Sequence, residues 1–295
     1  MKKMKARSAR RTTAADVLII ALFAVLAVIT LYPMWHCVVG SLMSYTEYMQ
    51  KSVLIWPDDL TLESYKFVFD QGKIYDPMKT TVLITIVGTI CNMAMVTWMA
   101  YGLSKKFPGS TLFTYIVVFT MFLNPGLIAN YMLFRNLRLL NDLKVYILPY
   151  LINTLYLVIL RTNFASFPSE LEEAARIDGA SEYGTFFRIV LPLSKPILAT
   201  IALFTAVDYW NTYQQSVYFM SDSSKKTLQD YLYMLLSNNS NNNAGVGIGA
   251  GGVSAVFSET IKLANTVIAV LPILVVYPFL QKYFTNGIMI GALKG

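Results

Sequence analysis

Charged residues are scarce in this chain of 295 residues. Only 14% of the residues are Asp, Glu, Lys or Arg, whereas an average soluble domain carries about 25%. Hydrophobic residues make up 55% of the chain, and the mean hydropathy is +0.50. The apolar residues stand in long blocks and do not recur with the period of an amphipathic helix or strand. This composition argues against a water-soluble globular enzyme and indicates a membrane protein.

Histidine and cysteine are nearly absent from the sequence. His36 is the single histidine, and both cysteines, Cys37 and Cys91, lie inside apolar stretches. These counts argue against a disulfide framework and against a metal site rich in cysteine or histidine. The sequence also lacks a G-x-x-x-x-G-K-[ST] phosphate loop and any set of Ser, His and Asp suited to hydrolysis. We therefore expect no catalytic residue, metal or cofactor in this chain.

Long uncharged runs predict how often the chain crosses a membrane. A bilayer core of roughly 30 Å needs about 20 apolar residues in a helix, because lipid cannot satisfy backbone polar groups. Pro125-Gly126 should kink the third run, and Thr162–Phe167 could extend the fourth past Arg161. The sequence predicts an all-α protein with six transmembrane helices, at Val17–Met43, Thr80–Ser104, Thr111–Phe134, Val145–Leu160, Pro196–Met220 and Leu263–Leu280.

Basic residues near the ends of these runs predict their orientation. Cytoplasmic segments carry an excess of Lys and Arg, and the first helix usually dominates. Basic residues precede Val17 at positions 2, 3, 5, 7, 10 and 11, so we expect both termini in the cytoplasm. A cleaved signal peptide is the alternative, but the first apolar run exceeds the roughly 7–15 residues of such a peptide. We expect a basic N-terminus at 1–16 and a single transmembrane domain at 17–295.

The loops between the runs are too short to fold as separate domains. Gly247-Ile248-Gly249-Ala250-Gly251-Gly252 matches the G-x-G-x-x-G pattern of dinucleotide sites. That pattern functions only between a strand and a helix N-terminus, and here it follows an asparagine-rich stretch in an outer loop. We interpret residues 238–252 as a flexible loop.

The cytoplasmic loop 161–195 carries the most regular local pattern. Ser169 with Glu172 predicts a capping box after Pro168, and Gly179 should end the helix that starts there. A second helix from Ser181 should place Tyr183, Phe186, Phe187 and Val190 on one face until Pro192 stops it. Two short helices joined at a glycine could form a knob that another protein grips. A segment lying on the membrane surface is the alternative, although the acidic residues near Glu170 disfavour contact with an anionic leaflet.

This loop resembles the EAA signature of the membrane-spanning subunits of binding-protein-dependent ABC importers. The anchor residues Glu173-Ala174-Ala175, Gly179, Ile189 and Leu191-Pro192 stand at the spacing of that signature. The resemblance implies that the two helices dock on an ATPase subunit and that Gly179 makes the turn between them. It implies coupling roles for Glu173, Ala174, Ala175, Asp178, Gly179, Phe186, Phe187, Ile189, Leu191 and Pro192.

The similarity covers essentially residues 12–295. Asp178-Gly179-Ala180, Trp210-Asn211 and the tail 281–295 resemble sugar permeases like the second permease of the maltose importer. The ending from Gly287 to Gly295 is most like permeases of the complex-oligosaccharide branch. The resemblance implies an inner-membrane location and alternating access with two ATPase subunits, which bind ATP and Mg. It also implies a second permease that is a different chain, an extracellular solute-binding protein and surrounding membrane lipid, and no nucleic-acid partner.

Asp208 is the main candidate for contact with a transported solute. It is the one charge within its apolar run, and ionisable residues at membrane depth are functional suspects. Helical spacing places Asp208, Asn211, Thr212 and Gln215 on one face, and Trp210 and Tyr213 could either contact sugar or form an interfacial belt. Asparagines at membrane depth, such as Asn92 and Asn153, are explained as well by hydrogen bonds between helices.

The sequence thus predicts a non-catalytic permease that forms half of the pathway for a sugar or oligosaccharide. An importer of amino acids or peptides is one alternative. A self-contained secondary transporter is a second, and it would require networks of ionisable residues or an inverted repeat.

Overall fold

The computed structural model describes residues 14–237 and 258–292, and no β-strand occurs within those ranges. The predicted all-α class is therefore confirmed for the described chain. The basic N-terminus up to residue 13, the whole Asn/Gly-rich segment 238–252 and residues 293–295 lie outside it. The helices are α1 (Ala14–Ser41), α2 (Tyr45–Gln50), α3 (Glu63–Asp70), α4 (Tyr75–Ser104), α5 (Ser110–Thr120), α6 (Gly126–Asn136), α7 (Lys144–Ile147), η1 (Leu148–Tyr150), α8 (Thr154–Ala165), α9 (Ser169–Ile177), α10 (Glu182–Thr185), η2 (Phe186–Val190), α11 (Leu191–Leu193), α12 (Lys195–Trp210), α13 (Gln214–Phe219), η3 (Ser223–Lys225), α14 (Leu228–Ser237) and α15 (Ser258–Ala292).

Three described helical segments are long and apolar enough to cross a membrane. They are α1, α4 and the part of α15 at Glu259–Val276. Two further spans are formed if each of two bent helix pairs crosses as a unit: Lys144–Tyr150 with Thr154–Ala165, bent by 44°, and Glu182–Leu193 with Lys195–Trp210, bent by 80°. The described chain therefore contains three continuous spans, or up to five with the bent pairs.

The predicted third run is not one helix with a kink at Pro125-Gly126, because it is divided there into two separate helices. Helix α5 ends at Thr120 and α6 begins only at Gly126. Gly126 has a positive φ of 78°, and its N–H donates to the Asn124 side chain at 3.1 Å. This left-handed conformation suits glycine and turns the chain between the two helices.

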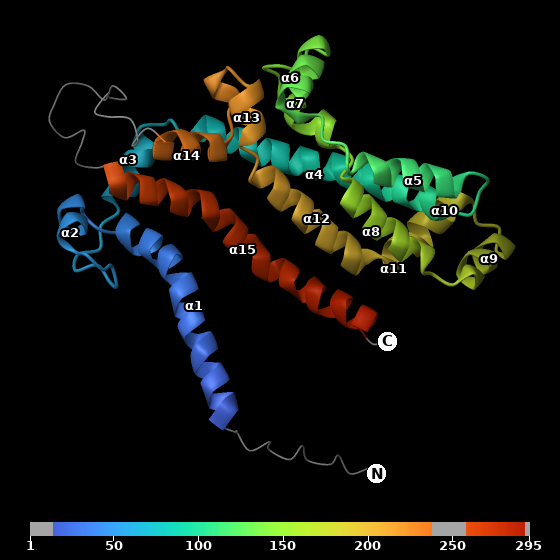
Figure 1. Cartoon of the computed structure of the whole chain (residues 1–295), viewed down its shortest axis with the longest axis horizontal. Coiled ribbons are helices and arrows are strands. Elements are labelled where there is room, and N and C mark those ends of the chain that lie inside the picture. The colour runs from blue at the N-terminus through green and yellow to red at the C-terminus, as the bar shows by residue number, and fades with distance from the viewer. Residues whose placement is uncertain (1–13, 238–257, 293–295) are drawn as a thin grey trace. The chain divides into compact units, whose positions relative to one another are not determined.

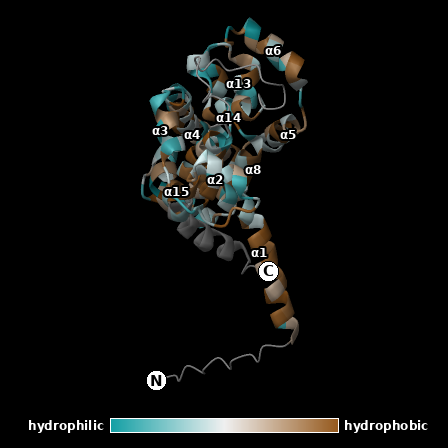
Figure 2. Ribbon diagram, turned by 90° about the vertical axis from the view of Figure 1, so that its left-hand side faces the viewer, coloured by the Kyte–Doolittle hydropathy of each residue, from teal (hydrophilic) through white to brown (hydrophobic). Residues whose placement is uncertain are grey.

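The described residues group into two compact units, residues 14–68 with 258–267, and residues 69–237 with 268–292. In the first unit, the visible part of α1 is mostly apolar (Figure 2), and none of its most apolar 18-residue window is buried. Trp35 stacks on Trp56, with ring centroids 6.0 Å apart, and donates to the Ile55 carbonyl at 2.8 Å. A helix that is apolar on all faces requires lipid or another chain around it.

The core of the second unit lies where α4 packs against α8 and α12, which run alongside it (Figure 1). Asn92 of α4 donates to the Tyr150 carbonyl at 3.0 Å and accepts from Thr205 at 3.5 Å. These hydrogen bonds join three parts of the chain, as expected of a buried asparagine in a helix bundle. The buried apolar side chains of this core are Val96, Ala100, Tyr101, Leu103, Tyr156, Leu157, Leu160, Phe164, Phe186, Val190 and Ile201.

Gly88 permits the close approach of α4 and α12. A Cβ atom built at Gly88 would lie 2.6 Å from the ring of Tyr209, whereas one built at Gly102 on the same helix meets nothing within 4 Å. We predict that Gly88→Ala lowers stability by about 1–3 kcal/mol through overpacking. The matched control Gly102→Ala should be neutral or stabilising, because alanine is the better helix former. Thermal unfolding of the purified variants measures both effects, and equal melting temperatures would contradict this packing.

Candidate functional site

Helix α9 forms where the sequence predicts it, at Ser169–Ile177 after Pro168. The predicted capping box is wrong, however. The N-cap is Pro168, which makes no side-chain cap, and Ser169 is already inside the helix. Glu172 instead pairs with Lys105 at the end of α4, with 2.5 Å between Nζ and Oε1. The Glu172 carboxylate, which the sequence pattern assigned to a capping box, therefore forms an ion pair with a lysine that is distant in the sequence.

Gly179 ends α9 with the hydrogen bonds of a Schellman motif. Its φ is +77°, its N–H donates to the Arg176 carbonyl at 3.0 Å, and the Ala180 N–H donates to the Ala175 carbonyl at 2.9 Å. Asp178 is the C-cap residue. The left-handed conformation at this position is the one that glycine adopts without a Cβ penalty. The predicted turn at Gly179 is confirmed.

The second helix begins at Ser181, whose hydroxyl accepts from the Gly184 N–H at 3.1 Å. It does not stop at Pro192, because proline lies in the first turn of α11 and the chain stays helical to Leu193. A proline in a first helical turn loses no hydrogen bond. The break comes instead at Ser194, before α12.

The predicted single face of this helix is divided by a π-helical segment. Phe186 and Val190 are buried in the core of the second unit, where the Phe186 ring lies 4.7 Å from that of Tyr101. Tyr183 and Phe187 are 65% and 56% exposed. A π-turn holds more residues per turn than an α-helix and so rotates the residues that follow. The spacing i, i+3, i+4 and i+7 therefore does not describe one surface here.

Ion pairs brace these helices against the end of α4. Besides Glu172, the ammonium of Lys105 lies 3.9 Å from Glu182 and 4.3 Å from the centre of the Tyr101 ring. Burial acts to lower the pKa of Lys105, but Glu172 and the Tyr101 hydroxyl outweigh it, so this pKa lies above its ordinary value. Arg176 pairs with Glu182 at 2.6 Å across the glycine turn. The two helices are therefore fixed to each other and to α4.

We call residues 169–193 the coupling knob, after the role that the sequence resemblance implies for them. Its exposed apolar tip is Ile177, 86% exposed, beside the turn at Gly179. Ile177 was not singled out from the sequence. Its position immediately before the predicted turn at Asp178-Gly179 is the signal that could have identified it. Of the signature residues, Glu173, Ala174, Asp178 and Pro192 are exposed, Ile189 and Leu191 are half-buried, and Ala175 is buried.

A second candidate site is a hollow of about 130 Å³ between α4, α8 and α12. It is lined by the tyrosines 146, 150, 156 and 209 and by the polar residues Asn92, Asn153, Thr205, Asp208, Thr212 and Gln215. Asp208 accepts a hydrogen bond from the Tyr156 hydroxyl at 2.7 Å. These side chains suit recognition of a hydroxyl-rich solute by donors, acceptors and ring faces.

Two of the five sequence candidates for solute contact, Asp208 and Gln215, line this hollow. Helix α12 ends at Trp210, so the expected continuous helical face through Gln215 does not form. Asn211 accepts from Gln229 at 3.3 Å, and Tyr213 packs on Tyr233. Trp210 is buried and donates to the Ala269 carbonyl at 3.0 Å, so it packs between helices and not in an interfacial belt.

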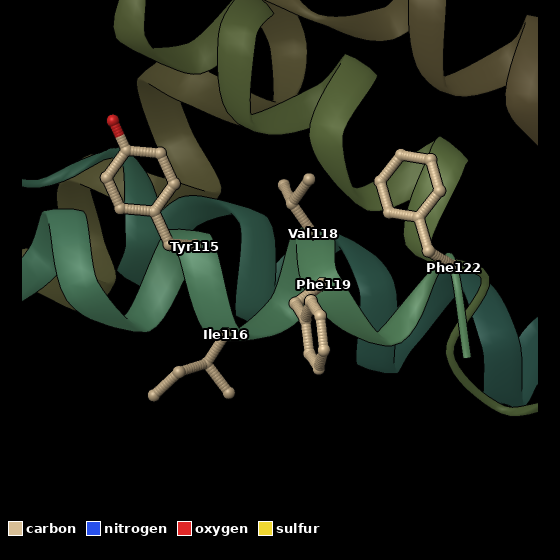
Figure 3. A pocket seen from close by; sticks show the side chains of 5 residues that line it. All are labelled: Tyr115, Ile116, Val118, Phe119 and Phe122. Carbon is tan, nitrogen blue, oxygen red and sulfur yellow. The ribbon is translucent and has the colours of Figure 1, made fainter.

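A larger hollow, of about 490 Å³, lies on α5 and carries no comparable chemistry. It is lined by Tyr115, Ile116, Val118, Phe119 and Phe122 (Figure 3). Ile116 and Phe119 extend from one side of the ribbon in that view, and the other three from the opposite side. This open apolar surface suits lipid or a packed helix, and it offers fewer hydrogen-bonding side chains than the smaller polar hollow.

The opposite end of α4 from the coupling knob is joined to the loop 219–228 (Figure 1). Thr80 donates to the Ser224 carbonyl at 3.4 Å, and Thr81 accepts from the Leu228 N–H at 2.8 Å. Asn141 accepts from the backbone of Ser221 and of Asp222 at 3.2 and 2.9 Å. Since α4 has 30 residues, these two ends lie roughly 45 Å apart.

Residues 94–290 match the family described as binding-protein-dependent transport system inner membrane component. The chain is 38% identical, over 95% of its length and 98% of the relative, to the polygalacturonan/rhamnogalacturonan transport system permease protein YtcP of Bacillus subtilis (strain 168). It is 30% identical, over 92% of its length and 94% of the relative, to the arabinooligosaccharides transport system permease protein AraQ of Halalkalibacterium halodurans.

The fold is similar to that of a solved permease structure. The chain superposes on one chain of a bacterial ABC transporter involved in the import of the acidic polysaccharide alginate, with a TM-score of 0.85 and 27% identity. The match covers 95% of this chain and 100% of the other.

Proposed function

Since the chain belongs to the family of binding-protein-dependent transport system inner membrane components, we propose that it carries a sugar or oligosaccharide through the bacterial inner membrane as half of an importer's pathway. The main observation that supports this proposal is the similarity to sugar-transport permeases over nearly the full length of both chains. The polar hollow around Asp208, lined by tyrosines and amides, supports a sugar as solute.

The permease does not itself hydrolyse ATP. In this family a separate subunit carries out the hydrolysis. We propose as partners two ATPase subunits that bind ATP and Mg, a second permease chain and an extracellular solute-binding protein. The α1 surface supports a partner chain or lipid around it, since its most apolar window is unburied.

The coupling knob is the proposed docking element for the ATPase. Its exposed tip at Ile177 offers an apolar contact, and Glu173 and Asp178 surround the tip with acidic side chains. The ion pairs of Lys105 with Glu172 and Glu182 would transmit movement of the knob to α4. α4 in turn contributes Asn92 to the hollow.

We propose six spans with both termini in the cytoplasm, α5 and α6 together forming the third, and residues 17–295 forming one permease domain. The coupling knob and the loop 219–228 lie at opposite ends of α4, which supports placing them on opposite sides of the membrane. Arg161, Arg176, Arg188 and Lys195 lie in or beside the knob, as expected of a cytoplasmic segment.

Cysteine labelling tests this topology. We predict that Ser223→Cys reacts with a membrane-impermeant maleimide in intact cells, whereas Ser169→Cys reacts only after permeabilisation, because both positions are exposed but lie at opposite ends of α4. A parent with Cys37 and Cys91 replaced by serine is the control. Labelling of both positions in intact cells would contradict the topology.

Reconstitution tests the proposed solute class. The complete complex in proteoliposomes, with its binding protein outside and ATP inside, should take up a sugar or oligosaccharide. Uptake of amino acids or peptides alone would replace this proposal with that of another importer. The described residues offer one carboxylate in the hollow and no ionisable network, which argues against a self-contained secondary transporter.

A further inference from the structure

The hollow contributed by this chain carries one formal charge. Asp208 is the single acidic residue in its lining, and none of the described lining residues is Lys, Arg or His. The Tyr156 hydroxyl, a neutral donor, holds one carboxylate oxygen of Asp208 at 2.7 Å. No ion pair to Asp208 occurs among the described residues, and its side chain is exposed on the isolated chain.

A carboxylate that has no cationic partner attracts uncharged sugars and repels negatively charged ones. Hydroxyl groups of a neutral sugar can donate to the free oxygen of Asp208, and such charge-assisted hydrogen bonds are stronger than neutral ones. A uronate brings a second carboxylate into the same space, where like charges repel more strongly than in bulk water. Recognition of carboxylates in proteins normally uses Arg or Lys, which the described lining lacks.

We propose that the pathway wall formed by this chain selects neutral oligosaccharides over uronate-containing ones, and that Asp208 is the residue that determines this charge preference. The inference rests on the proposed function and specifies the substrate class, and it sets this chain apart from the polygalacturonan/rhamnogalacturonan permease to which it is similar. The neighbouring side chains Asn92, Gln215 and Thr212 can hydrogen-bond either kind of sugar, so the discrimination resides in the carboxylate.

Two probes that differ in charge and share a backbone test this proposal: trigalacturonate and its methyl triester. Equilibrium dialysis of each labelled probe is done against the purified complex of both permeases and both ATPase subunits, without the binding protein. It gives the two affinities without selection by that protein. We expect the ester to bind at least about tenfold more tightly than the acid, corresponding to roughly 1.4 kcal/mol. Asp208→Asn should bring the two affinities within about threefold, chiefly by improving binding of the acid.

Asp76→Asn is the matched control, because Asp76 is an exposed carboxylate on α4 outside the hollow. This variant should keep the preference of the parent. A merely structural role of Asp208 would weaken both probes equally and leave their ratio unchanged, which would overturn the proposal. Equal binding of the two probes by the parent, or binding of neither, would also overturn it.

Failure of this inference can be told apart from failure of the proposed function. A complex that takes up sugars in proteoliposomes but binds acid and ester equally remains a sugar permease without the charge preference. A complex that takes up no sugar contradicts the proposed function itself.

Discussion

Replacing Gly179 by proline should abolish ATP-driven uptake while the protein still inserts into the membrane. Gly179 has a φ of +77°, and its N–H donates to the Arg176 carbonyl. Proline fixes φ near −65° and has no N–H, so the turn between α9 and α10 cannot form. The knob would lose its shape without any change in the spans. We expect uptake in proteoliposomes to fall by at least about tenfold, with ATP hydrolysis no longer stimulated by the loaded binding protein.

A graded series at this position separates backbone conformation from side-chain bulk. A Cβ atom at Gly179 would meet nothing within 4 Å, so a loss in Gly179→Ala reports the left-handed backbone alone. That conformation costs alanine about 1–2 kcal/mol, equivalent to roughly a fivefold to thirtyfold loss of the correctly turned population. Asparagine tolerates the conformation, and Gly179→Asn should retain most activity. Normal uptake by Gly179→Pro would refute the coupling role of this turn.

Replacing Ile177 by aspartate should release the ATPase subunit. The Ile177 side chain is 86% exposed at the tip of the coupling knob, and its burial in a partner would stabilise the complex by about 1.5–3 kcal/mol. Losing that contact and placing a charge there should weaken association by at least roughly tenfold to hundredfold. Binding of the purified ATPase subunit to the permease in nanodiscs, titrated by fluorescence, measures this loss.

Ile177→Val is the matched control, because it keeps a branched apolar side chain at the tip. It should bind the ATPase nearly as tightly as the parent. A second variant, Glu173→Lys, reverses an exposed charge on the same helix and should uncouple ATP hydrolysis from transport. Unchanged ATPase affinity in Ile177→Asp would place the docking surface elsewhere.

Local signals predicted the parts of the knob that depend on neighbouring residues alone. The helix after Pro168 and the glycine turn at Gly179 need only backbone preferences and a short hydrogen-bonded motif, and both were confirmed. Asp208 was singled out because a charge within an apolar run is conspicuous, and the structure places it in the polar hollow.

Features that depend on distant residues were not predictable in this way. Glu172 pairs with Lys105, 67 positions earlier, and not with a helix cap. The π-helical segment sends Phe186 into the core with Tyr101 while Phe187 stays exposed. Helical periodicity also assumed that α12 continues past Trp210, but the helix ends there and Trp210 is held by the Ala269 carbonyl. Tertiary contacts decide each of these outcomes.

Purification of the tagged chain from its native membrane, in a mild detergent, tests the central claim most directly. The co-purifying proteins are identified and counted by mass spectrometry. A permease subunit of an ABC importer should bring with it a second permease and two copies of an ATPase that carries a phosphate loop. A chain that purifies without any ATPase, and still transports sugar after reconstitution alone, would contradict this account.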